Sequence, residues 1–314
     1  MKKKALIISI KSYKLLKEER KILLNDKPWG LILFKRNIKS LQQIKTLIKN
    51  IRKASKDKKF PILIDEEGDK VSRLREIINN NISQKLFGDL YKSNKEISVN
   101  LYKSYINHLC KLFKEIGINI NTVPVLDVLR QSTNKIINSR SFSKDPKVVE
   151  KLGKICVNQY HINKIATVIK HVPGHGCAKQ DSHLKKPVVN LDFKDLNRID
   201  FYPFKNSKSK FAMTAHILYK KLDKLNVATT SKKIISNIIR KKLGFKGIII
   251  SDDISMKALK DDLTTNAKKS LLAGCNIVLY CAGNYKETRK LIKDVPFIDK
   301  FTIKKTSEIY KILG

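Results

Sequence analysis

The chain has 314 residues, of which 42% are hydrophobic and 30% are charged, so it is long and apolar enough to bury a full core. Its five cysteines are widely spaced and include no C-x-x-C pair, which argues against a disulfide framework or a zinc site and favours a reducing cytoplasm. The apolar run 5–10 after the first lysines is too short for a signal peptide, and no stretch has the length of a membrane span.

The formal net charge is +38, and lysine carries most of it, because only ten of the 66 basic residues are arginines. A basic surface attracts polyanions, so nucleic-acid binding is one interpretation. A specific nucleic-acid site would favour arginine and interleaved aromatic residues, whereas these lysines are spread over nearly every expected helix and loop. We therefore attribute the high lysine content to compositional drift, and we expect no specific nucleic-acid partner.

In chain order, short apolar runs alternate with longer stretches of helical periodicity. The expected strands are Ala5–Ile10, Leu31–Phe34, Pro61–Asp65, Ile118–Pro124, Ala166–Ile169, Phe211–Ala215, Gly247–Ser251 and Asn276–Tyr280. The expected helices are Glu18–Asn25, Leu41–Ala54, Ile97–Ile116, Pro146–Asn163, Leu196–Ile199, Lys232–Leu243, Met256–Ala273, Tyr285–Lys293 and Ile298–Leu313. Eight such units predict an α/β fold, a single-domain (β/α)8 TIM barrel over 1–314 with no second domain. The alternative, a doubly wound sheet, lacks its glycine-rich loop, since Lys11–Lys14 follows the first strand.

Polar side chains gather where the expected strands end, which is the face of a barrel that carries active sites. Strand three ends in Asp65-Glu66-Glu67-Gly68, strand four leads to Asp127, strand six is followed by His216, and strand seven ends in Asp252 and Asp253. Neighbouring residues on a strand point to opposite faces, so one of the last two aspartates is expected in the barrel mouth and the other as a helix cap or an orienting group. Spacing alone does not decide which of them is catalytic.

The loop after strand five is rich in histidine, with His171, His175 and His183 inside sixteen residues. Asp181 and His183 are two apart, so in an extended loop they can hydrogen-bond, and such a pair can transfer a proton near neutral pH. The alternative is that this segment is a surface loop whose charged side chains are solvated and have no catalytic role. A metal site built from these groups is a weaker interpretation, because no H-E-x-x-H or H-x-H pattern is present.

Three other basic residues are candidates for the site. Lys170, at the end of strand five, is interpreted as a Schiff-base nucleophile, a ligand for substrate hydroxyls or a structural ion-pair partner. Arg140, after strand four, is one of few arginines in a lysine-rich chain, which suggests bidentate binding of a carboxylate or a sugar diol. Arg73 is a weaker candidate on the same argument, and both arginines have a structural alternative.

Several sequence motifs occur in the same order along this chain as in a known protein family. The most specific read KHVPGHG at 170–176, with Asp181–His183 following, and SDDISM at 251–256. The others are Leu31–Asn37, Ile64–Gly68, Val71–Leu74, Pro124–Asp127, Arg140–Phe142 with Asp145–Pro146, Met213–Ile217 and Leu243–Gly247. Over roughly residues 30 to 280 the chain resembles the glycoside hydrolase family 3 β-N-acetylhexosaminidases of bacteria, the NagZ type.

That resemblance implies a cytoplasmic, retaining exo-enzyme that removes terminal β-linked N-acetylglucosamine from N-acetylglucosaminyl-anhydromuramyl fragments during peptidoglycan recycling. By motif position, Asp252 is implied as the nucleophile and His183, paired with Asp181, as the general acid/base. The implied sugar-binding residues are Asp65, Arg73, Arg140, Lys170 and His171. No cofactor, metal or membrane partner is expected, and we expect a monomer.

The chain departs from the family pattern at a few positions. Asp69 and Lys70 stand where the family usually has glycine and arginine, Val172 replaces the usual phenylalanine, and Cys177 replaces a common aspartate. The first two bear on the edge of the sugar pocket. The rival hypotheses are a Schiff-base aldolase or lyase that uses Lys170, and an inactive barrel that binds polyanions.

Overall fold

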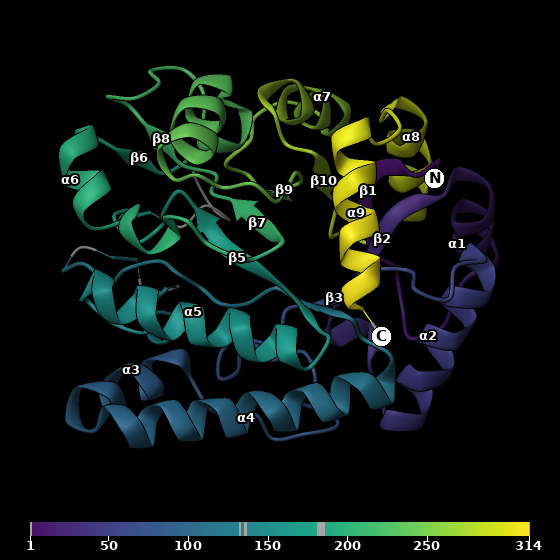
Figure 1. Cartoon of the computed structure of the whole chain (residues 1–314). Helices are drawn as coiled ribbons and strands as arrows, with labels where there is room; N and C mark the ends of the chain where they lie inside the picture. The colour runs from purple at the N-terminus through teal and green to yellow at the C-terminus, as the bar shows by residue number, and fades with distance from the viewer. Residues whose placement is uncertain (1, 132, 135–136, 181–185, 314) are drawn as a thin grey trace.

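The computed structural model describes residues 2–131, 133–134, 137–180 and 186–313. In this part of the chain, eight parallel strands form one closed barrel in the order β1-β10-β9-β7-β5-β4-β3-β2, with helices packed around it (Figure 1). The predicted single-domain TIM barrel is therefore confirmed. A separate short pair, β6 (Val188–Val189) with β8 (Leu218–Tyr219), lies outside the barrel.

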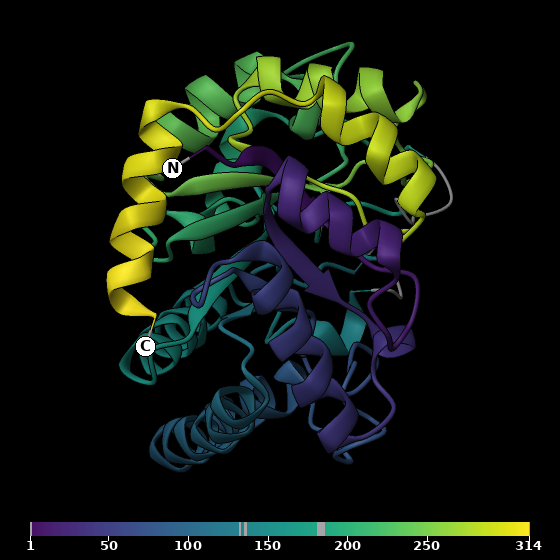
Figure 2. The same ribbon diagram turned by 90° about the vertical axis from the view of Figure 1, so that its right-hand side faces the viewer.

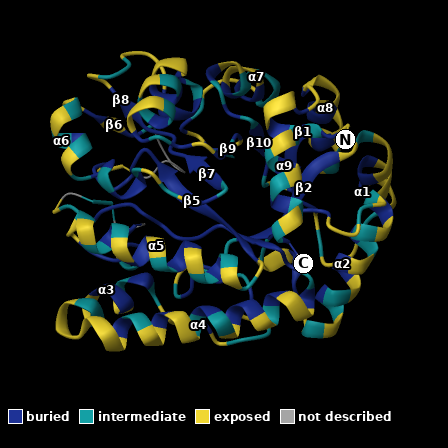
Figure 3. Cartoon of the chain, viewed as in Figure 1, coloured by how far each residue is buried: buried dark blue, intermediate teal, exposed yellow. Residues whose placement is uncertain are grey.

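Each predicted strand forms, with ends that differ by a few residues. The barrel strands are β1 (Lys4–Ile8), β2 (Pro28–Leu33), β3 (Ile62–Ile64), β4 (Ile120–Asn121), β5 (Ala166–Val172), β7 (Phe211–Thr214), β9 (Ile248–Asp253) and β10 (Ile277–Leu279). Their residues are almost all buried, because the barrel interior covers one face and the helices cover the other (Figure 3). The near-continuous isoleucine, leucine and valine content of these runs follows from this double burial.

The helices bury one face and expose the other, as the helical periodicity predicts. They are α1 (Lys17–Lys21), α2 (Leu41–Ser55), α3 (Gln84–Ser93), α4 (Lys95–Ile116), α5 (Pro146–Ile162), α6 (Phe193–Arg198), α7 (Leu263–Ala273), α8 (Tyr285–Asp294) and α9 (Lys300–Ile312). Two π-helical segments, Ile22–Asp26 and Ile234–Lys242, complete the predicted helices that follow the first and sixth strands.

Two expectations about helices were wrong. The helix expected over 256–273 begins only at Leu263, because Asp262 caps it by accepting hydrogen bonds from the N–H groups of Thr264 and Thr265. Helix α3 was missed, although Ser83 caps it in the same way through the N–H of Leu86. In both cases a side-chain cap marks where the helix begins.

Helix α9 lies across the end of the barrel at which the strands begin (Figure 2). The indole Nε1 of Trp29, the second residue of β2, donates to Thr306 Oγ1 on α9 at 2.9 Å, and the ring makes an edge contact with Phe211. Lys3 donates to Asp57 and to Tyr310 on the same side. The barrel interior is therefore closed at its amino end by α9 and these contacts. No helix in the described part of the chain is long and apolar enough to cross a membrane.

Candidate active site

A cavity of about 650 Å³ opens at the carboxyl ends of the barrel strands. This is the end at which TIM barrels carry their active sites, and the volume suits a ligand of sugar size or larger. Its charged and histidine lining comprises Asp65, Glu67, Lys70, Arg73, Arg140, Lys170, His171, His175, Asp252 and Asp253. The apolar lining includes Phe34, Val71, Ile137, Met213, Met256 and Leu279.

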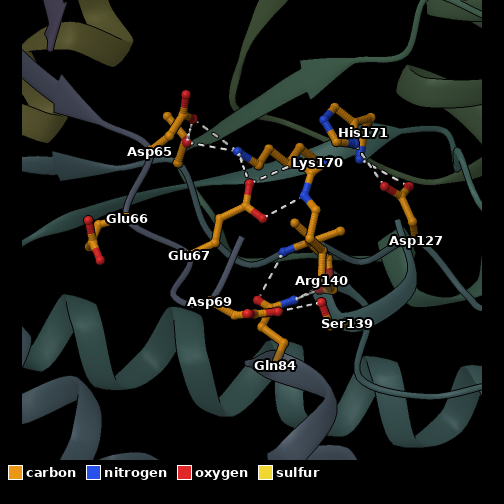
Figure 4. Close-up of polar contacts among 12 residues, drawn as sticks. Asp65, Glu66, Glu67, Asp69, Gln84, Asp127, Ser139, Arg140, Lys170 and His171 are labelled. Carbon is orange, nitrogen blue, oxygen red and sulfur yellow. Dashed lines mark hydrogen bonds and ion pairs between the residues drawn. The ribbon is translucent and has the colours of Figure 1, made fainter. Parts of the chain in front are cut away.

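A cluster of paired charges occupies one side of this cavity (Figure 4). The ammonium of Lys170, on β5, donates to Glu67 Oε1 at 2.7 Å and to Asp65 Oδ1 at 3.0 Å, and a third hydrogen bond joins it to Thr122. Arg140 grips Glu67 with two bonds, from Nε at 2.7 Å and from Nη2 at 2.9 Å. Arg73 Nη2 lies 3.3 Å from Asp65 Oδ2. Four of the five predicted sugar-binding residues thus meet with Glu67 in one cluster, which we call the charge cluster: Asp65, Glu67, Arg73, Arg140 and Lys170.

These contacts determine which charges the groups carry. Burial alone would raise the pKa of Asp65, but Lys170 and Arg73 outweigh it and hold that pKa well below its usual range. Burial likewise opposes ionisation of Glu67, yet Arg140 and Lys170 lower its pKa to about 2. The two carboxylates also raise the pKa of Lys170 against the effect of burial. The cluster is therefore fully ionised at neutral pH.

Strand alternation explains which acidic residues enter the cavity. Asp65 and Glu67, two residues apart after β3, both point to Lys170, whereas Glu66 between them points away (Figure 4). Glu66 accepts instead from Asn80 and from the backbone N–H of Arg73 and Leu74, and burial raises its pKa. The sequence analysis noted Glu67 at this strand end but named only Asp65 as a site residue. The two-residue spacing was the signal that could have identified it.

His171 is held by a buried carboxylate that the sequence interpretation noted only as a strand end. Asp127 Oδ2 lies 2.7 Å from His171 Nδ1, and Asp127 Oδ1 accepts from the backbone N–H of His175 at 2.6 Å. Because the carboxylate can only accept, Nδ1 of His171 carries the proton and Nε2 is the ring atom left for a ligand. Burial lowers the pKa of His175 to about 4, so this second imidazole is neutral at pH 7.

Asp252 and Asp253 end β9 on another part of the cavity wall. Asp253 accepts from the N–H of Ser255 at 3.1 Å and from its hydroxyl at 2.8 Å. These bonds stabilise a turn, whereas the next helix begins only at Leu263 with Asp262 as its cap, so the predicted helix-capping role is wrong. Burial raises the pKa of Asp253. Asp252 Oδ1 accepts from the N–H of Asp253 at 2.8 Å. His216 bonds Thr229 and the carbonyl of Asp253 through its two ring nitrogens, so it supports this strand end rather than facing a ligand.

Asp181 and His183, the predicted acid/base pair, lie outside the described residues. The loop leading to them is described to residue 180, and its backbone is tied to the loop after β4. Thr133 donates to the carbonyl of Gly176 at 2.6 Å, and the N–H of Asn134 donates to the carbonyl of Ala178 at 3.1 Å. Within the described residues, no group of three or more histidine, cysteine, aspartate and glutamate side chains has the geometry to hold a metal.

The Schiff-base interpretation of Lys170 does not fit this environment. A Schiff-base lysine must lose its proton to attack a carbonyl, so such lysines have a lowered pKa. Asp65 and Glu67 raise the pKa of Lys170 instead, and Lys170 donates to both of them and to Thr122. Lys170 is therefore an ammonium that holds two carboxylates in position.

A (β/α)8 barrel with ionised carboxylates, cations and histidines around one cavity at its carboxyl end defines the class, a TIM-barrel enzyme that binds a polar substrate. The sequence profile described as the glycosyl hydrolase family 3 N terminal domain matches residues 2–305. The chain therefore belongs to glycosyl hydrolase family 3, and it is a glycoside hydrolase.

The relatives agree with this assignment. A β-hexosaminidase of Nitrosomonas eutropha is 32% identical over 257 residues, 80% of this chain and 73% of the relative. A β-hexosaminidase of Actinobacillus succinogenes is 33% identical over 282 residues, 88% of this chain and 80% of the relative. Among solved structures, native NagZ of Neisseria gonorrhoeae superimposes with a TM-score of 0.90 at 27% identity, covering 100% of this chain and 91% of that one. The chain is thus similar to β-hexosaminidases in sequence and fold.

Proposed function

We propose that this protein is a retaining exo-β-N-acetylglucosaminidase. The observation that carries the proposal is the cavity in which the ionised charge cluster and Asp252 line one space. A pyranose presents hydroxyls that carboxylates and ammonium groups bind well, and Asp252 on the adjoining wall supplies the carboxylate that we assign to attack its anomeric carbon. The similarity to β-hexosaminidases, and to a NagZ solved with N-trifluoroacetyl-D-glucosamine (26% identity), favours an N-acylated amino sugar.

In the proposed mechanism, Asp252 attacks the anomeric carbon and forms a covalent glycosyl-enzyme while the leaving oxygen takes a proton. His183, held by Asp181, supplies that proton and then removes one from the water that releases the sugar. These two roles come from the sequence motif. Water attacks the face opposite to the ester bond, so the second displacement restores the β configuration.

The charge cluster has the binding role in this scheme. Asp65, held by Lys170 and Arg73, is proposed to accept hydrogen bonds from two sugar hydroxyls, and Arg140 and His171 to contact the same ring. Because these groups are pre-arranged by their mutual bonds, little entropy is lost in ordering them when the sugar binds.

We further propose that the natural substrate is an N-acetylglucosaminyl-anhydromuramyl fragment and that the enzyme acts in the cytoplasm, as a monomer, in peptidoglycan recycling. The resemblance to NagZ-type enzymes supports this choice. We also propose that the barrel supplies every catalytic group by itself.

An aryl-glycoside panel tests the proposal. The purified chain is expected to cleave 4-nitrophenyl β-N-acetylglucosaminide much faster than the matching glucoside, without added metal, and proton NMR should detect the β-anomer first. His183→Ala should lose most activity on substrates with poor leaving groups. An α-anomer as first product would contradict retention, and salt-sensitive polyanion binding without cleavage would favour the inactive barrel.

A further inference from the structure

Lys70 differs from the other cations that line the cavity. Arg73, Arg140 and Lys170 each bond a carboxylate of the charge cluster. Lys70 lines the same cavity from an exposed position, and no hydrogen bond or ion pair joins its ammonium to another group within the described residues. The charge of Lys70 is therefore available to a ligand in a way that the charges of the other three are not.

The backbone that carries Lys70 is held firmly. In the turn after β3, the N–H of Val71 donates to the carbonyl of Gly68 at 3.1 Å, and the N–H of Glu67 donates to the carbonyl of Val71 at 2.9 Å. Asp69 has a left-handed backbone with φ of 47°, a conformation that aspartate adopts more readily than most residues. Its carboxylate accepts from Ser139 Oγ at 2.6 Å, and its N–H donates to the carbonyl of Asn80 at 2.9 Å.

This turn is thus joined to the loop that carries Arg140, since Ser139 is the preceding residue. Arg140 and Ser139 hold two points of the segment 67–69, through Glu67 and Asp69 respectively. Lys70 follows directly, so its main chain is placed by the same contacts that place the charge cluster. A flexible side chain on a fixed main chain can reach a ligand at the rim without reorganising the cluster.

We propose that Lys70 is a specificity-determining residue that binds a carboxylate on the leaving group of the substrate. This inference rests on the proposed function, in which the charge cluster takes the terminal sugar and the leaving group extends towards the rim. Asp252 and Asp253 line the cavity and disfavour an anionic leaving group by repulsion. A free ammonium at the rim offsets that repulsion and provides a point charge for the carboxylate.

The test compares two substrates that differ by one charge: 4-nitrophenyl β-N-acetylglucosaminide and its 3-carboxy-4-nitrophenyl analogue. The measured quantity is the ratio of kcat/KM for the carboxylated substrate to kcat/KM for the neutral one. In Lys70→Met this ratio should fall about fivefold, as expected for an exposed ion pair, and Lys70→Glu should lower it further. Lys70→Arg should restore it, and added salt should weaken the preference in the unmodified enzyme.

Lys53→Met is the matched control, because Lys53 is an exposed lysine on α2 that does not line this cavity. The ratio should be unchanged in this variant. Equal losses on both substrates in Lys70→Met would indicate a structural role and overturn the inference, as would an unchanged ratio. If the unmodified enzyme cleaves neither substrate, the proposed function itself fails and the inference falls with it.

Discussion

The basic residues at the two ends of the barrel lie in different surroundings. At the carboxyl end, the side chains of Lys170 and Arg140 are largely shielded from solvent and form ion pairs with carboxylates of the charge cluster. At the amino end, a groove of about 610 Å³ lies where α2 and α4 finish, just before β3 and β4. Its basic lining comprises Lys45, Lys49, Arg52, Lys53, Lys56, Lys58 and Lys114. Lys49, Lys53 and Lys114 are exposed there and have no ion pair with any residue that the structure describes.

This contrast shows that the pairing and burial of basic residues distinguish the two ends of the barrel better than the number of basic residues does. The groove carries more basic residues than the cavity, yet its lysines contact mainly solvent, which screens them. Lys170 and Arg140 at the carboxyl end are largely desolvated, so each of their bonds is stronger and each missing partner is costly. The interpretation of the +38 charge as compositional drift stays a prediction, and the variants below sharpen it.

The largest effect is expected at Asp252. Asp252→Ala should lower kcat by about 10³-fold or more, because removal of an attacking group abolishes the covalent route. Sodium azide should restore part of the turnover and give an α-glycosyl azide, since a small anion can occupy the vacated space. Thermal melting should show that the variant is folded. Activity close to that of the unmodified enzyme would show that another group is the nucleophile.

Replacing a buried cation should cost more stability than replacing an exposed one. Lys170→Met leaves Asp65 and Glu67 without a shared partner, so the free energy of unfolding should fall by about 3–5 kcal/mol. Lys53→Met in the groove should change it by less than about 0.5 kcal/mol. Urea unfolding of both variants measures the difference. Similarly small losses of unfolding free energy in Lys170→Met and Lys53→Met would contradict the distinction between the two ends of the barrel.

Acid should weaken the charge cluster in a defined pH window. The pKa of Glu67 is lowered from 4.5 to about 2, so its stabilising effect is complete above pH 4.5 and is lost as the pH falls towards 2. Such a shift corresponds to about 3 kcal/mol. We expect the free energy of unfolding, measured with urea at pH 7, 4.5 and 3, to be higher for the unmodified protein than for Glu67→Gln at pH 7. This difference should shrink as the pH falls. A constant difference across this range would contradict the assignment.

The smallest effect is expected in the groove. Replacing Lys49, Lys53 and Lys114 together by glutamine should lower the salt concentration needed to elute the protein from heparin, because non-specific polyanion binding depends on net charge. Hydrolysis of aryl glycosides should not change, since the groove lies at the opposite end of the barrel. A large loss of hydrolysis would show that the two ends are coupled.

The sequence predicted the barrel well because eight buried parallel strands produce short apolar runs that alternate with helical patterns. It also identified Asp65, Arg73, Arg140 and Lys170, which the structure brings together. It missed the pairing among them, because Glu67 joins Lys170 and Arg140 across three different strand ends, and separation in sequence does not reveal such contacts.

Other features depend on local geometry that composition does not encode. Asp127 was noted as a strand end, but its bonds to His171 and to the loop at His175 need the neighbouring strand to be in place. The roles of Asp252 and His183 stay predictions. Helix α3 was missed because its short amphipathic pattern lies in a segment between two strands where one helix was already expected.

The one tryptophan in the sequence, Trp29, gives this molecule a built-in optical reporter. Its indole is fully buried at the amino end, hydrogen-bonded to Thr306 of the last helix and in contact with Phe211. Its emission should therefore change when α9 detaches or the whole barrel melts, and should stay constant when a sugar occupies the distant mouth. Fluorescence titration with a ligand and fluorescence-detected denaturation thus follow separate events in the same sample.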